Sequence, residues 1–132
     1  MATYDSTLSS PPSDPRELEL WVQHAAGFIF FEDMREYAIQ RIDPGLTQDA
    51  QAAARKGIDD AVYGLMMILD GVTGGLTNER NRVDLRVTVG LTECDSQQKI
   101  VEVDLADGDG MCMAYHGWLD GDFGETPIVE SD

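Results

Sequence analysis

The sequence predicts an α+β fold in which two to three N-terminal helices pack on one face of a small antiparallel β-meander. Apolar residues recur at three- and four-residue spacing over residues 15–42 and 48–70, which is the period of an amphipathic helix. From residue 83 onward the apolar residues alternate with polar ones, which is the period of a half-buried strand. Because helices come first and strands second, rather than in alternation, the order favours α+β over α/β.

The first helix is predicted to begin at Pro15. Asp14 suits the N-cap position, Pro15 suits the first helical position, and Glu17 follows at the spacing of a capping box. The helical pattern then continues to about residue 42. One straight helix of that length would measure about 40 Å, so we expect a break or kink near Gly27.

The second helix is predicted over residues 48–70, with Thr47 as its N-cap and Gly71 as the left-handed residue that ends it. Its last turns are apolar nearly all round, which predicts the most buried helix, lying across the sheet. Gly64 interrupts it at a cost of about 1 kcal/mol relative to alanine. We therefore expect another backbone to approach Gly64 closely.

Three strands are predicted. Residues 83–92 and 98–105 alternate around the turn ECDSQQ, which predicts an antiparallel hairpin. The turn DGDG precedes MCMAYHGW, whose residues 111–116 are expected to add a third strand. The domain organisation that follows is a flexible tail over 1–13, a single domain over 14–126 and an acidic tail over 127–132.

Charge is the main anomaly of the composition. The chain has 25 acidic and 9 basic residues, a net charge of −16, and Lys99 is its last base. Such a balance argues against nucleic acid and anionic membranes as partners, since both require basic residues, and it favours a basic protein partner. Homo-oligomer formation stays open.

The compartment is predicted to be the cytoplasm. The N-terminal residues lack the charged and apolar regions of a signal peptide, and no apolar run approaches the roughly 18 residues of a membrane span. Cys94 and Cys112 are too few for a disulfide scaffold, so reduced thiols are the simpler account, although a bridge between them stays open.

The stretch DGDGMCMAYHGWLDGDFGE, residues 107–125, concentrates the residue types that metal sites use. It does not match a calcium-binding EF-hand loop, because Met111 and Cys112 occupy ligand and glycine positions. His116, Asp120 and Asp122 could hold a divalent ion, but their spacing is not diagnostic. Cys112 and His116 cannot form a catalytic dyad within a strand, where they would lie about 13 Å apart.

The run ARKGIDDAVYGLMMILDGVTGGL, followed by a hairpin and an acidic Gly/His/Trp segment, resembles a family of small uncharacterised acidic bacterial proteins. The resemblance covers the last two thirds of the chain and implies no activity, cofactor or site. Bacterial immunity proteins are similar in size and charge, without a shared motif.

Two hypotheses follow. The first is a non-enzymatic interaction protein, inhibitor or immunity-like, that binds a basic partner and needs no cofactor, metal or catalytic residue. The alternative is a small metal-dependent enzyme centred on His116, Asp120 and Asp122. We favour the first, because the charge is observed whereas catalytic geometry is only conjectured. Its expected contact residues are Glu102, Asp104, Trp118, Asp120, Asp122 and Glu125. Trp118 would be an anchor only if exposed; the more ordinary alternative is that its ring folds back onto the core.

Overall fold

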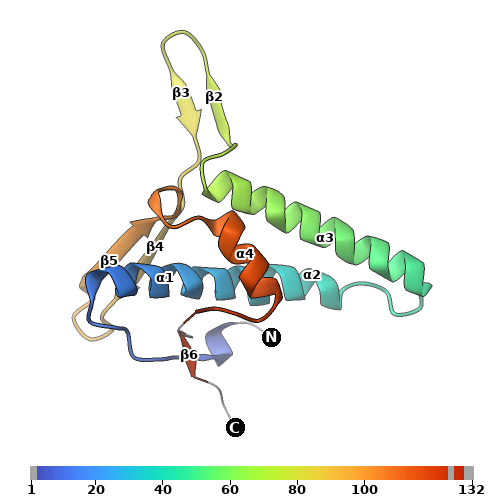
Figure 1. Ribbon diagram of the computed structural model, residues 1–132, viewed down its shortest axis with the longest axis horizontal. Helices are drawn as coiled ribbons and strands as arrows, with labels where there is room; N and C mark the ends of the chain where they lie inside the picture. The colour runs from blue at the N-terminus through green and yellow to red at the C-terminus, as the bar shows by residue number, and fades with distance from the viewer. Residues whose placement is uncertain (1–2, 125–126, 130–132) are drawn as a thin grey trace.

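Helices form the body of the protein, and short antiparallel strand pairs are attached to it (Figure 1). The computed structural model describes residues 3–124 and 127–129. The order of elements confirms the α+β class. Among the described residues, none of the helices has both the length and the apolar character needed to cross a membrane.

The first helix has the predicted start. Helix α1, Pro15–Phe30, begins after Asp14, whose carboxylate accepts a hydrogen bond from the Glu17 amide at 3.0 Å. The helix continues as a π-helical segment, Phe31–Glu36, and then as α2, Tyr37–Gln40. The break expected near Gly27 is therefore wrong: Gly27 lies inside α1, and the irregularity begins only at Phe31. Such π-segments insert one residue per turn without ending the helix.

Helix α3, Gln48–Leu69, also begins and ends where expected. The Thr47 hydroxyl accepts a hydrogen bond from the Ala50 amide at 3.2 Å, and Gly71 adopts a left-handed φ of 76°. The close approach expected at Gly64 is wrong, since a Cβ built there has no neighbour within 4 Å. The most buried residues of α3 are Val62, Met66 and Leu69.

The main hairpin pairs β4, Thr88–Thr92, with β5, Lys99–Asp104, in antiparallel register from Thr88↔Asp104 to Leu91↔Val101. Helix α1 covers it: Trp21, Val22 and Val103 form one buried cluster. The prediction that residues 48–70 lie across this sheet is wrong, because α3 packs instead against a fourth helix. Residues 70–74 then connect α3 to the next strand, which begins at Gly75.

That fourth helix, α4, Met111–Leu119, replaces the predicted third strand. The prediction failed because nearly every position of this short run is apolar or small, so it carries no clear period of two. Helix α4 lies between α1 and α3 (Figure 1) and forms the main core with them. A one-turn 3-10 helix, Leu105–Asp107, connects it to β5.

The predicted strand over 83–92 is also divided in two. Its first part is β3, Arg82–Asp84, which pairs with β2, Gly75–Thr77, in a separate hairpin. This hairpin projects from the body beyond the end of α3 (Figure 1).

The two segments expected to be tails meet in the structure. Strand β1, Thr7–Leu8, follows a 3-10 turn at Thr3–Asp5 and pairs with β6, Ile128–Val129. Pro127 beside it is buried. The flexibility of 1–13 and the domain boundaries stay predictions, and residues 130–132 of the expected acidic tail lie outside the described residues.

Candidate functional site

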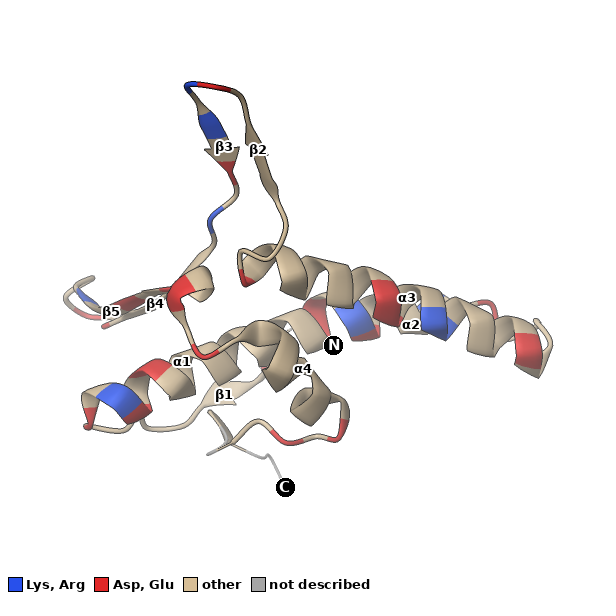
Figure 2. Ribbon diagram, turned by 45° about the horizontal axis from the view of Figure 1, so that its top comes forward, with Lys and Arg blue, Asp and Glu red and all other residues tan. Residues whose placement is uncertain are grey.

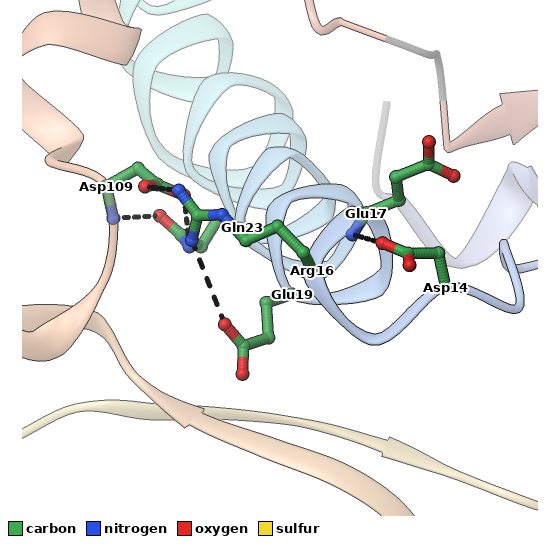
Figure 3. Close-up of polar contacts among 6 residues, drawn as sticks. All are labelled: Asp14, Arg16, Glu17, Glu19, Gln23 and Asp109. Atoms are coloured by element: carbon green, nitrogen blue, oxygen red, sulfur yellow. Dashed lines mark hydrogen bonds and ion pairs between the residues drawn. The ribbon is translucent and has the colours of Figure 1, made fainter.

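The stretch singled out in the sequence is attached to the helices at three points. The first is Asp109, beside the N-terminal half of α1 (Figure 3). The buried Gln23 side chain accepts a hydrogen bond from the Asp109 amide at 2.9 Å and donates one to its carboxylate at 3.3 Å. Arg16 forms an ion pair with the same carboxylate. A Cβ at Gly108 would lie 2.6 Å from Gln23 Oε1, so a larger residue there would displace the Gln23 amide.

The second attachment caps helix α4. Asp70, which follows α3, accepts hydrogen bonds from the amides of Met111 at 2.5 Å and Cys112 at 2.9 Å. The carboxylate thus satisfies two N-terminal amides of α4 and lies at the positive end of its dipole. Sequence analysis missed this role because the cap lies 41 positions before Met111, whereas Gly110 provides no local cap.

The third attachment is Trp118 at the end of α4. Its indole donates a hydrogen bond to His24 Nδ1 at 3.0 Å, and Phe123 stacks on it with ring centroids 6.1 Å apart. The lack of a side chain at Gly27 makes room for the indole, since a Cβ there would lie 2.3 Å from Trp118 Cζ2. Trp118 is only 1% exposed. It is therefore a core residue and not a surface anchor, which corrects its inclusion among the expected contact residues.

Residues 119–124, which we call the acidic loop, follow directly. The amides of Asp120 and Asp122 donate to the carbonyl of Gly117, and the Asp122 carboxylate accepts from the Gly124 amide at 2.9 Å. Gly121 and Gly124 have φ values of 82° and 69°, which favour glycine. The loop is therefore held in one shape by its own hydrogen bonds and by the ring of Phe123.

The other expected contact residues lie elsewhere. Glu102 forms an ion pair with Lys99, and Asp104 pairs with Arg86 at 3.1 Å while also accepting from the Ala106 amide. Strand β5, which carries both, is separated from the acidic loop in Figure 2. Glu125 lies outside the described residues. The acids after Lys99 therefore do not form one continuous face in the described structure.

The two groups of acidic residues differ in whether a basic side chain pairs with them. Basic partners hold Glu102, Asp104 and Asp109, whereas Asp120 and Asp122 are exposed and, within the described residues, have no ion pair to Lys or Arg. The acidic loop therefore presents two carboxylates that are available to a partner.

The alternative metal site gains no geometric support. Over residues 3–124 and 127–129, no group of three His, Cys, Asp or Glu side chains could hold a metal ion. His116 is exposed on α4, and its ring lies 5.9 Å from that of Tyr63.

The separation predicted for Cys112 and His116 is wrong, because the segment is a helix and not a strand. Positions four apart in a helix lie on the same face, closer together than in a strand. Partial burial and the nearby carboxylate of Asp70 nevertheless raise the pKa of the Cys112 thiol. A raised pKa disfavours the nucleophilic thiolate.

The pKa of His24 is shifted in the opposite direction from that of Cys112. Burial lowers its pKa, although the negative charges of Asp122 and Asp109 act against this. The neutral ring is the form that accepts the Trp118 hydrogen bond at Nδ1.

Fold and site together define a small α+β protein that presents a preorganised acidic loop. No family model, no curated protein and no solved structure matches the chain.

Proposed function

We propose that this chain is a cytoplasmic, non-enzymatic bacterial interaction protein, inhibitor or immunity-like, that binds a basic protein partner through the acidic loop. One observation carries the proposal: the carboxylates of Asp120 and Asp122 are exposed and lack a basic partner among the described residues. Both belong to a loop whose Phe123 ring stacks on the buried Trp118.

The shape of the loop adds to this support. Binding usually costs free energy when a mobile segment becomes ordered, and a loop fixed beforehand avoids part of that cost. The net charge of −16 would also attract a cationic protein over a distance and speed its association.

The test begins with capture of the partner from the native host, followed by stopped-flow association kinetics. The double variant Asp120→Asn/Asp122→Asn is compared with Asp49→Asn/Asp60→Asn, which changes the charge equally on the exposed surface of α3. We expect the loop variant to lower the association rate by about tenfold or more and to reduce its dependence on salt. The control should change the rate much less.

Glu102 and Asp104 are tested separately, because they lie away from the loop and already have basic partners. We expect Glu102→Gln/Asp104→Asn to resemble the α3 control. Equal effects of all three double variants would mean that only net charge matters, and the loop would then not be the binding site.

A further inference from the structure

A small groove lies along one face of α1. Its volume is about 240 Å³, and the described residues that line it are Glu17, Leu20, Trp21 and His24. These positions have the spacing of a single helix face. Leu20 is 41% exposed, whereas Trp21 is 4% exposed and its indole donates a hydrogen bond to Ser9 Oγ at 3.4 Å. The groove therefore has a fixed aromatic wall beside an exposed apolar side chain.

The groove adjoins the acidic loop at His24. A Cβ built at Gly124 would lie 2.8 Å from His24 Nε2, so the end of the loop touches this ring. The carboxylate of Asp122 is close enough to act on the charge of the ring. The ring itself is fixed by the hydrogen bond that its Nδ1 accepts from Trp118. Groove and acidic loop thus belong to one surface.

The charge in the groove is negative and has no basic partner within the described residues. Glu17 is exposed, and Figure 3 shows it with Asp14 on a side of the helix away from the ion pairs of Arg16. Arg16 binds Glu19 and Asp109 instead. The carboxylate of Glu17 is therefore available to a cation from another molecule.

The size of the groove restricts what it can hold. A volume of about 240 Å³ is below the roughly 300–1,000 Å³ of pockets that bind small-molecule ligands. A single side chain fits better than a cofactor. An apolar wall next to a carboxylate matches a long basic side chain, which has an aliphatic stem and a charged end.

We propose that the groove binds an arginine side chain of the basic partner. Arginine suits it better than lysine, because the planar guanidinium pairs with a carboxylate through two hydrogen bonds and also stacks on aromatic rings. This inference rests on the proposed function and extends it. The acidic loop attracts the partner, and the groove beside the loop holds one of its side chains, since arginines that enter pockets are frequent anchors of interfaces.

The first test needs no partner. The full chain is titrated with N-acetyl-arginine amide, and N-acetyl-citrulline amide, which has the same shape without the charge, is the control ligand. We expect saturable NMR shifts of the Trp21 indole and of the Glu17 and Gly124 amides, with a dissociation constant of about 1 mM or weaker. Citrulline amide should cause no saturable shift over the same concentrations.

Unspecific attraction must be distinguished from binding, because a chain of net charge −16 accumulates any cation. Asp49 on α3 and Glu79 between β2 and β3 are exposed acids distant in sequence from the groove and provide the comparison. Equal shifts at these two residues and in the groove would overturn the proposal. Equal shifts with citrulline amide would do the same.

Two matched pairs of variants test the walls of the groove. Glu17→Gln should weaken binding of the arginine probe about fivefold, the upper range for an exposed ion pair, whereas Glu19→Gln, on the same helix, should change it less than twofold. Leu20→Gln should weaken it about threefold, and Ile29→Gln, 45% exposed on α1, should leave it unchanged. Circular dichroism checks that each variant retains the fold. Equal effects within both pairs would overturn the proposal.

Kinetics with the captured partner separate this inference from the proposed function. Glu17→Gln should mainly raise the dissociation rate, about fivefold, whereas the loop variant Asp120→Asn/Asp122→Asn should mainly lower the association rate. A loop variant that behaves like the α3 control would contradict the proposed function. If the loop variant acts as expected but Glu17→Gln gives the same rates as Glu19→Gln, the groove inference alone is overturned.

Discussion

Two glycine-rich segments of this molecule differ in whether their apolar side chains are buried. The segment 108–124 buries Met111, Tyr115 and Trp118 almost completely. Residues 72–87, the arm that contains β2 and β3, leave Leu76 and Val83 exposed. The difference lies in the anchors. Side chains of α1 and the end of α3 bind the first segment, but among the described residues the arm makes its hydrogen bonds mainly within itself. Apolar content alone therefore does not determine which segment joins the core.

The largest expected effect contrasts the two segments directly. Trp118→Ala should lower the free energy of unfolding by about 3–5 kcal/mol, because it removes a fully buried ring that contacts Phe123 and His24. Leu76→Ala in the arm should change it by less than about 0.5 kcal/mol. Denaturant titration at low protein concentration measures both. Similar losses would mean that the arm is as much a part of the cooperative unit as α4.

A pair of helical glycines provides the next contrast. Gly27→Ala should destabilise by about 1–3 kcal/mol, because its Cβ would overlap the rigid Trp118 ring. Gly64→Ala should stabilise by up to about 1 kcal/mol, because the space around it is open and alanine favours the helix. Thermal unfolding of both variants checks the opposite signs. A loss at Gly64 equal to that at Gly27 would contradict this account of the packing.

The same contrast explains what the sequence could predict. Helices α1 and α3 were predictable because their caps, Asp14 and Thr47, lie next to them. The β4–β5 hairpin was predictable from its alternation. Helix α4 was not, because its capping carboxylate belongs to Asp70, distant in sequence, and its residues have no distinctive period.

The candidate site was only partly predictable. Asp120 and Asp122 could be selected from charge alone, and both are exposed. The pairing of Asp104 with Arg86, and of Asp109 with Arg16, depends on contacts between distant segments that no local pattern encodes. The alternation over 83–91 predicted extended backbone. It could not predict that Val83 would lie in the arm while Val89 packs against the core.

Substitution of Asp70 tests whether a capping residue distant in sequence stabilises the helix in segment 108–124. Asp70→Ala should destabilise by about 0.5–2 kcal/mol, the usual cost of losing a helix cap. Asp107→Ala is the control, since this exposed residue caps no helix among those described. Chemical denaturation measures both changes, and hydrogen exchange of the α4 amides should increase in the Asp70 variant only. If both variants behaved alike, the carboxylate of Asp70 would contribute nothing to α4.

The smallest expected effect depends on pH and on His24. Its pKa is lowered in the folded protein by burial, while Asp122 and Asp109 partly oppose the shift. Glu17 and Trp21 line the groove beside the ring, and Trp118 donates to its Nδ1. Because the unfolded chain protonates His24 more readily than the folded one, the resulting stability is present above the usual pKa of 6.5 and is lost as pH falls toward the lowered value.

Unfolding titrations between about pH 7.5 and pH 5.5, above the range of most carboxylates, isolate this contribution. The free energy of unfolding should fall with decreasing pH by no more than about 1.4 kcal/mol per pH unit, the limit for one proton. His24→Gln should flatten the slope, because glutamine does not titrate and its carbonyl can still accept from an indole. His116→Gln, on the exposed face of α4, is the matched control and should leave the slope intact. A slope that survives His24→Gln unchanged would assign the pH dependence to another group and leave the Trp118–His24 contact without a role in it.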